Sequence, residues 1–104
     1  MKLLRACGID EIDPGDALKL LCEPPIAVFN VDGEFYATQD TCTHGQSSLS
    51  DGYLDGDIIE CSWHMGKFCV RTGDVVSMPP CEALKTYPVV IKDGAVFVQL
   101  ESND

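Results

Sequence analysis

Cations are scarce in this sequence. Lys and Arg together number 7, against 17 Asp and Glu, so the formal net charge is −10. Proteins that bind nucleic acid neutralise its phosphates with clustered Lys and Arg, and no such cluster is present. The composition therefore excludes nucleic acid as a partner. An anionic membrane surface would repel the chain for the same reason, whereas basic patches on other proteins would attract it.

Long apolar runs are also missing. No stretch approaches the roughly 20 residues that a transmembrane helix needs. The first residues, Met1–Arg5, lack the apolar core of a secretory signal. We therefore expect a cytoplasmic protein with no membrane anchor, in a compartment where cysteines usually stay reduced. A disulfide scaffold is thus a poor explanation for the six cysteines, and a metal site is the first alternative.

Short segments rich in β-branched and aromatic residues alternate with Gly-containing turns along the chain. The segments that predict strands are Ile26–Val31, Glu34–Thr38, Asp57–Glu60, Val89–Ile91 and Ala95–Val98. Many short antiparallel strands indicate an all-β sandwich or barrel. A chain of 104 residues fits one domain, so we expect residues 1–104 to form a single unit.

Two hairpin turns are clear in this pattern. Asp32-Gly33 and Asp93-Gly94 each lie between apolar strands, and Asp-Gly suits the type I′ turn, whose twist matches that of the strands. Helix signals are weak. Ile9–Ile12 could form one turn, which Pro14-Gly15 would end. The polar stretch from Gln39 to Ser50, and a second stretch after Cys61, predict irregular loops.

Both histidines of the chain lie in these two loops, each close to a cysteine. The first loop reads Cys42-Thr43-His44 and the second reads Cys61-Ser62-Trp63-His64, with 16 residues between His44 and Cys61. Thiolates and imidazoles together suit an iron–sulfur centre, zinc or copper, but not magnesium or calcium. A strand between the loops would bring them side by side. The four side chains therefore predict one metal centre.

The spacing Cys-x-His, about sixteen residues, Cys-x-x-His resembles the signature of Rieske [2Fe–2S] proteins. The similarity extends over essentially the whole chain, to the ferredoxin components of bacterial aromatic-ring dioxygenases such as the biphenyl, toluene and cumene systems. The segments that carry it are Asn30–Glu34, Cys42–Gly45, Leu49–Leu54 and Gly66–Gly73.

The resemblance implies a ligand set and a layout. In this family two cysteines bind one iron and two histidines bind the other. Cys42 and Cys61 would hold the inner iron, and His44 and His64 the outer one. The Rieske fold implied is an antiparallel base with a small cluster-binding subdomain, here about residues 39–81. In the family, the prolines near Pro79-Pro80 belong to a loop that covers the cluster.

The resemblance also implies a role. A flavoprotein reductase takes electrons from NADH, the ferredoxin carries them singly, and a terminal ring-hydroxylating oxygenase performs the oxidation. We expect a monomer that forms transient complexes with both partners. The chain is not expected to be an enzyme, because both histidines serve as ligands and no Gly-rich phosphate loop is present. Nor can it supply the two histidines of an oxygenase's mononuclear iron site.

Two departures separate this chain from the respiratory-complex branch of the family. The cysteines that form a disulfide in that branch correspond to Ser47 and Trp63 here, so this disulfide cannot form. The serine and tyrosine that donate hydrogen bonds to the cluster correspond to Gly66 and Phe68. Because such donors raise the reduction potential, we expect a value at the low end of the Rieske range, roughly −150 mV.

Two rival interpretations remain for the chain as a whole. The first is a structural zinc site, which also accepts two cysteines and two histidines, although zinc sites usually group like ligands at short spacing. The second is a small Rieske-like subunit held permanently in an enzyme such as nitrite reductase. A shuttle would purify as a monomer, whereas a subunit would stay bound to its enzyme.

Several other side chains have two possible interpretations. Cys7, Cys22, Cys69 and Cys81 are expected to be small buried hydrophobic residues, the alternatives being a Cys69–Cys81 disulfide or a redox-sensing thiol. Trp63 and Met65 either form a docking rim around the cluster or merely cover the loops. The carboxylates of Asp51, Asp55, Asp57 and Glu60 are either a solvated acidic surface or a docking face.

Overall fold

Antiparallel strands make up almost all of the regular structure in the computed structural model, which describes residues 2–42, 47–61, 66–77 and 82–100. The elements are β1 (Lys2–Gly8), β2 (Ala17–Leu20), β3 (Ile26–Val31), β4 (Glu34–Gln39), the short 3₁₀ helix η1 (Leu49–Asp51), β5 (Tyr53–Asp55), β6 (Ile58–Glu60), β7 (Lys67–Cys69), β8 (Val75–Ser77), β9 (Thr86–Tyr87), β10 (Val89–Lys92) and β11 (Ala95–Leu100). The all-β prediction is confirmed.

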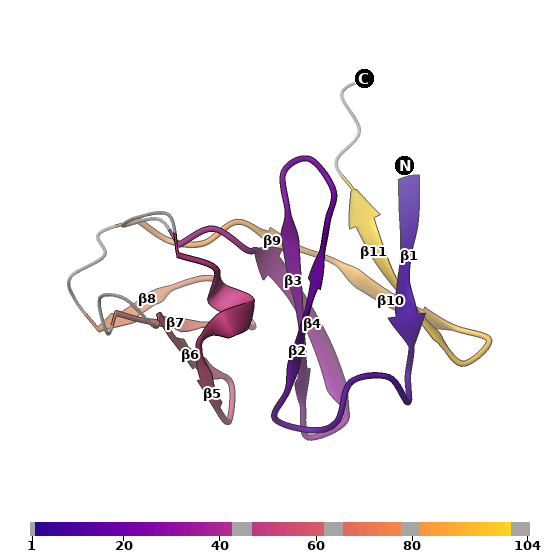
Figure 1. Cartoon of the computed structure of the whole chain (residues 1–104), viewed down its shortest axis with the longest axis horizontal. Coiled ribbons are helices and arrows are strands. Elements are labelled where there is room, and N and C mark those ends of the chain that lie inside the picture. The colour runs from indigo at the N-terminus through magenta and orange to yellow at the C-terminus, as the bar shows by residue number, and fades with distance from the viewer. Residues whose placement is uncertain (1, 43–46, 62–65, 78–81, 101–104) are drawn as a thin grey trace.

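The strands form three sheets, seen side by side in Figure 1. Their strand orders are β1-β11-β10, β2-β3-β4-β9 and β5-β6-β7-β8. The third sheet is made from one stretch of chain, residues 53–77, and lies at the opposite end of the molecule from β1, β10 and β11. It falls inside the range predicted for a cluster-binding subdomain.

Both predicted hairpins form with the expected turn. Asp32 and Gly33 have φ angles of 51° and 92°, and Asp93 and Gly94 have φ angles of 53° and 76°. Positive φ at both central residues defines the type I′ turn. The turns set the register of β3 against β4 and of β10 against β11.

Strand β3 is buried along its whole length because it separates two cores. Successive side chains of a strand point to opposite faces, so Ala27, Phe29 and Val31 enter one core while Ile26 and Val28 enter the other. We call the first the cysteine core; its further buried members are Cys42, Leu49, Ile59, Cys61, Phe68, Val70 and Leu84. The second, the terminal core, also contains Cys7, Ile12, Ala37, Tyr87, Val96 and Val98.

Residues 9–12 form a single hydrogen-bonded turn and a bend, with no regular helix. The Glu11 N–H donates to the Gly8 carbonyl at 3.1 Å, and the Glu11 carboxylate accepts a hydrogen bond from the Gly8 N–H at 2.6 Å. Of the irregular stretch predicted after Cys61, residues 62–65 lie outside the described residues, and β7 and β8 form a hairpin beyond them. Within the described ranges, no helix is long and apolar enough to cross a membrane.

The third sheet is tied to the second at a glycine. Gly73, in the β7–β8 turn, has a φ of +83°, and a Cβ placed on it would lie 2.3 Å from the Leu84 carbonyl oxygen. The Gly73 carbonyl accepts a hydrogen bond from the Leu84 N–H at 2.7 Å. Only glycine permits both the left-handed backbone and this approach. The chain that leads into β9 is therefore held directly against the third sheet.

Candidate metal centre

Two of the predicted ligands, Cys42 and Cys61, lie in the cysteine core. Cys42 follows β4 at a distance of three residues, and Cys61 directly follows β6. Their exposed fractions are 3% and 1%, and both belong to the cluster that contains Phe29 and Phe68. The other two predicted ligands, His44 and His64, lie outside the described residues. The structure thus brings the two cysteines into one apolar environment and does not test the histidines.

The backbone closes both cysteine loops in the same way. The Cys42 N–H donates to the Ser47 carbonyl at 3.0 Å, and the Cys61 N–H donates to the Gly66 carbonyl at 2.8 Å. Each bond therefore spans five residues and starts at a cysteine. Thr41 and Ser48 form a bridge beside the first closure. Two loops of matched closure hold the two thiols in place.

A side-chain contact joins the two loops. The hydroxyl oxygen of Ser47 lies 2.8 Å from the sulfur of Cys61, in the buried interior. The family resemblance places Ser47 where the respiratory-complex branch carries a disulfide cysteine. Phe68 is fully buried in the same core and brings no hydroxyl. Trp63, Met65, Gly45 and Pro79-Pro80, also discussed above, lie outside the described residues.

The buried carboxylate of Asp40 organises the first loop, and the sequence reasoning missed it. Its oxygens accept hydrogen bonds from the Ser48 hydroxyl at 2.5 Å and the Ser50 N–H at 3.0 Å. Its backbone carbonyl accepts from the Leu49 N–H at 2.6 Å. The Lys19 ammonium lies 3.6 Å from the carboxylate, whose side chain is only 2% exposed. The sequence feature that could have indicated this role is Asp40 ahead of the serine-rich segment Ser47–Ser50, since Asp side chains commonly accept hydrogen bonds from nearby backbone N–H groups.

Polar side chains also fix the segments that flank the site. The amide of Gln39 donates to the Thr41 carbonyl at 2.7 Å and accepts from the Lys85 N–H at 2.8 Å. The backbone N–H of Gln39 donates to the Lys85 carbonyl at 2.8 Å. Gln39 therefore connects the start of the Cys42 loop to the chain before β9 through hydrogen bonds.

Arg71 links the third sheet to the β3–β4 hairpin. Its guanidinium donates to Asp57 at 3.0 Å, lies 3.6 Å from Glu34, and stands 5.3 Å from the ring centre of Tyr36. The arginine is about half exposed, so each contact is weak alone. Asp57, considered above as a docking carboxylate, is thus already paired within the molecule.

The remaining cysteines differ from one another. Cys7 is a free thiol, 1% exposed, in the terminal core, and burial raises its pKa, with the nearby Glu11 carboxylate adding to the effect and Arg5 opposing it. This agrees with the reading of a small buried hydrophobic residue. Cys22 and Cys69 are free thiols but are only partly buried, so the prediction that they are buried hydrophobic residues holds only in part. Cys81 lies outside the described residues.

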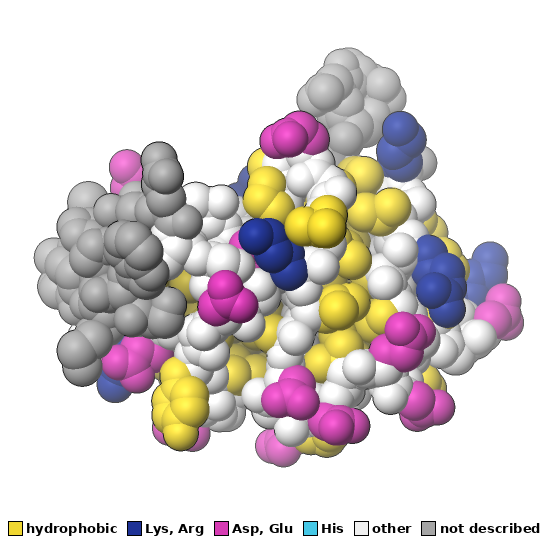
Figure 2. All heavy atoms as spheres, in the orientation of Figure 1, with side chains coloured by type: hydrophobic (Ala, Val, Ile, Leu, Met, Phe, Trp, Pro, Cys, Tyr) yellow, Lys and Arg dark blue, Asp and Glu magenta, His cyan; other side chains and the backbone are white. Residues whose placement is uncertain are grey.

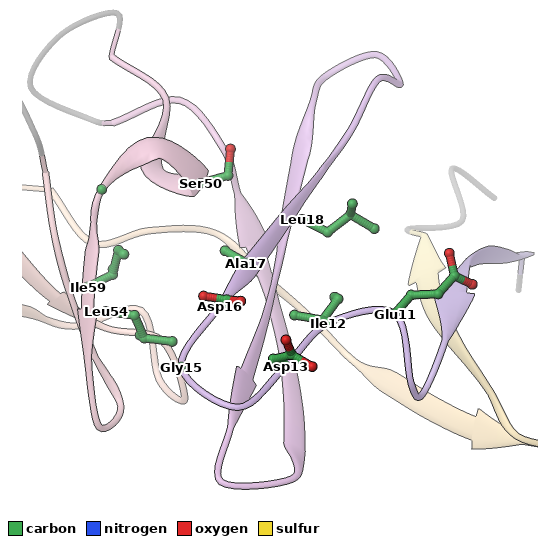
Figure 3. A pocket seen from close by; sticks show the side chains of 11 residues that line it. Glu11, Ile12, Asp13, Gly15, Asp16, Ala17, Leu18, Ser50, Leu54 and Ile59 are labelled. Atoms are coloured by element: carbon green, nitrogen blue, oxygen red, sulfur yellow. The ribbon is translucent and has the colours of Figure 1, made fainter.

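A pocket lies between the loop before β2 and the third sheet (Figure 3). Asp13 and Asp16 line it on one side, and Ser50, Leu54 and Ile59 on the other. None of the described residues that line it is a cysteine or a histidine. In the parts of the chain that the structure describes, no three or more His, Cys, Asp or Glu side chains are grouped to hold a metal ion. Acidic side chains are spread over the face shown in Figure 2, as the net charge predicts.

Residues 2–88 match the family model of the Rieske [2Fe–2S] domain. The chain belongs to the Rieske family. Its cofactor is therefore a [2Fe–2S] cluster. The donor set in the structure fits this cofactor, because two buried cysteine sulfurs, one of them 2.8 Å from a hydroxyl, lie on two matched loops.

Relatives that share more than 40% of their residues with this Rieske chain include ferredoxins. It is 60% identical over 100 residues to the biphenyl dioxygenase ferredoxin subunit of Pseudomonas sp. (strain KKS102), covering 94% of this chain and 92% of the relative. The solved Sphingomonas yanoikuyae B1 ferredoxin is 42% identical with a TM-score of 0.91, covering 96% of this chain and 100% of the ferredoxin. These similarities make the chain an electron carrier of an aromatic-ring dioxygenase system and not an enzyme by itself.

One solved structure shows such a ferredoxin with a partner. It is the complex of reduced oxygenase and oxidised ferredoxin of carbazole 1,9a-dioxygenase. A chain of that structure is 44% identical to this Rieske chain, with a TM-score of 0.89, and the match covers 92% of this chain and 100% of that one.

Proposed function

We propose that this chain carries single electrons from a flavoprotein, NADH-dependent ferredoxin reductase to the terminal oxygenase of an aromatic-ring dioxygenase system. In this proposal Cys42 and Cys61 bind the inner iron, and His44 and His64 bind the outer one. Residues 39–81 act as the cluster-binding part of a single domain of residues 1–104. When bound, the cluster supplies a site that takes up and releases one electron.

The observation that carries the proposal is the pair of buried cysteines on matched loops. Burial in an apolar core beside Phe29, Ile59 and Phe68 excludes water from the sulfurs. The closing hydrogen bonds from Cys42 and Cys61 fix the backbone from which the thiolates extend. Fixed ligands suit electron transfer, because a rigid site reorganises little when its charge changes.

Transient docking fits the charge and the size of the molecule. The net charge of −10 would steer the protein towards basic patches on its partners and keep it monomeric. Redox encounters typically bury less than about 1,200 Å² in total. We propose a cytoplasmic monomer that meets the reductase and the oxygenase in turn. Electron transfer from the reductase should slow as salt rises, because added ions screen this attraction.

The first experiment is the visible and EPR spectrum of the purified protein before and after dithionite. A brown oxidised form and a reduced signal of low average g are expected for mixed Cys and His ligation. A colourless, EPR-silent protein containing one zinc ion would overturn the proposal in favour of the zinc module.

Ligand assignment is tested with serine variants of matched cysteines. Cys42→Ser and Cys61→Ser should each abolish the visible bands, because an iron ligand is lost. Cys69→Ser should keep them, since Cys69 is a partly buried free thiol outside the two loops. Retention of a normal spectrum in either of the first two variants would contradict the assignment.

The shuttle role is tested by mixing. Stopped-flow absorbance should show reduction by NADH plus a flavoprotein reductase, and reoxidation by a biphenyl-type oxygenase. Size-exclusion chromatography should give a monomer alone and a short-lived complex with either partner. Permanent co-purification with one enzyme would favour the fixed-subunit alternative instead.

A further inference from the structure

Within the described residues, the hydroxyl of Ser47 contacts the sulfur of Cys61, which is a predicted iron ligand. Ser47 is 5% exposed, and its oxygen lies 2.8 Å from the Cys61 sulfur. This is a close contact, shorter than most hydrogen bonds to sulfur, and buried hydroxyls in proteins are normally satisfied by a partner. The contact with Cys61 therefore provides the buried Ser47 hydroxyl with a hydrogen-bond partner.

The backbone of Ser47 is held by contacts that do not involve Cys61. The Ser47 carbonyl accepts the bond that closes the first loop, from the Cys42 N–H at 3.0 Å. The neighbouring Ser48 is tied to the buried Asp40 carboxylate and to Thr41. Contacts on the first loop thus fix the backbone from which the Ser47 side chain reaches a sulfur of the second loop.

The direction of the bond depends on the state of the sulfur. With a free thiol, either atom could donate. An iron-bound thiolate carries no proton, so only the serine hydroxyl can donate. This step rests on the proposed function, in which Cys61 is an iron ligand.

We propose that Ser47 sets the reduction potential of this ferredoxin by donating a hydrogen bond to the Cys61 thiolate. Reduction adds one negative charge to the centre, and the charge spreads onto its sulfurs. A donor to sulfur is therefore bound more strongly in the reduced state, which raises the potential. The absence of hydroxyls at Gly66 and Phe68 lowers the potential, and Ser47 offsets part of that loss from the opposite loop.

The size of the effect follows from the difference between the two states. The hydrogen bond exists in both oxidised and reduced protein, so only its strengthening counts. A change comparable to one net hydrogen bond corresponds to about fivefold in the ratio of reduced to oxidised protein. At 59 mV per factor of ten for one electron, that ratio equals about 40 mV.

The test uses the holoprotein, with the potential measured by voltammetry for wild type, Ser47→Ala, Ser47→Thr and Ser50→Ala. Ser47→Ala should shift the potential to a more negative value by the amount above. Ser47→Thr, which keeps a hydroxyl, should restore it. Ser50→Ala is the matched control, because it removes a hydroxyl of the same loop that bonds Ser48 and not a cysteine.

A second measurement needs no variant to fold. Resonance Raman spectra of wild type in H₂O and D₂O should show an isotope shift in an Fe–S(Cys) stretching band. Ser47→Ala should reduce that shift. If Ser47→Ala does not load its cluster, Ser47→Thr and the wild-type isotope shift still decide the matter: a Thr variant at the wild-type potential with the shift retained supports the proposal, and absence of the shift in wild type overturns it.

Failure of this inference is distinct from failure of the proposed function. A wild-type protein with a Rieske spectrum whose potential is unchanged in loaded Ser47→Ala would overturn only the role of Ser47. A faster loss of cluster in that variant, at an unchanged potential, would make Ser47 purely structural and would also overturn it. A wild-type protein without the Rieske spectrum would overturn the proposed function itself.

Discussion

The two cores on either side of β3 are built differently. The terminal core is framed by long strands: β1 pairs with β11 from Lys2 to Gly8, and β11 pairs with β10. The sheet that frames the cysteine core consists of four strands of three residues each. Backbone pairing alone is sparse in such short strands, so other contacts must hold this end of the molecule.

Besides the apolar packing of the cysteine core, those contacts include single polar side chains. Asp40 fixes the first cysteine loop, Gln39 clasps the chain before β9, and Arg71 joins the third sheet to the β3–β4 hairpin. One core therefore mainly maintains the fold, while the other positions two sulfurs with residue-specific bonds. The division predicts that stability and cluster retention respond differently to changes on the two sides.

The largest expected effect comes from a matched pair of core truncations. Ile26 in the terminal core and Ile59 in the cysteine core are both 1% exposed. Ile26→Ala and Ile59→Ala should each lower the free energy of unfolding by about 2–5 kcal/mol, because each leaves a cavity. Only Ile59→Ala, two residues before Cys61, should also speed cluster loss well beyond its effect on unfolding. Thermal melts by circular dichroism and the decay of visible absorbance measure the two quantities.

If the rate of cluster loss rose by the same factor in both isoleucine variants for the same loss of stability, the proposed difference between the two cores would be wrong. The cores would then act as one cooperative unit, and the cysteine loops would open only when the whole domain unfolds.

A smaller effect is expected from the buried carboxylate. Asp40→Asn removes the charge that Lys19 faces and weakens the acceptor for Ser48 and the Ser50 N–H. The expected cost is about 1–3 kcal/mol, the range for leaving buried partners poorly satisfied. Cluster retention, followed by visible absorbance at fixed temperature, should fall with it.

The exposed Asp51 provides the control for that change. Asp51→Asn alters the same charge in the same region and should change stability by no more than about 0.5 kcal/mol. Equal behaviour of the two variants would mean that net charge, and not the Asp40 contacts, holds the loop.

Local sequence patterns were enough to predict the two hairpins and strand β3. Asp-Gly at 32–33 and 93–94 dictates type I′ hairpins, and the apolar run of β3 indicates a strand buried on both faces. The sequence did not reveal β7 and β8 as strands, because three-residue strands show too little alternation to detect. Glu11 closes the turn after β1 on both sides, since its carboxylate accepts a hydrogen bond from the Gly8 N–H and its own N–H donates to the Gly8 carbonyl.

The sequence supplied candidate ligands for the site, which remain a prediction, and did not indicate the residues that support them. Cys42 and Cys61 were found because a thiol and an imidazole recur at fixed spacing, and the spacing matches a family. Asp40 and Ser47 act through contacts that close only in three dimensions. Ser47 appeared in the sequence only as a missing disulfide cysteine, whereas the structure gives its hydroxyl a partner of its own.

The smallest expected effect on stability comes from Arg71, which lies at the junction between the third sheet and the β3–β4 hairpin. Arg71→Gln removes the ion pairs with Asp57 and Glu34 and the contact with the Tyr36 ring. Because the arginine is about half exposed, the loss should be about 0.5–1 kcal/mol in denaturant titrations at low salt. The difference from wild type should shrink near 1 M salt, where the screening length is about 3 Å. Lys92→Gln, on an exposed residue of β10, is the control for losing one positive charge. A salt-independent loss in Arg71→Gln, or an equal loss in Lys92→Gln, would show that packing or net charge, and not this set of contacts, joins the third sheet to the rest of the domain.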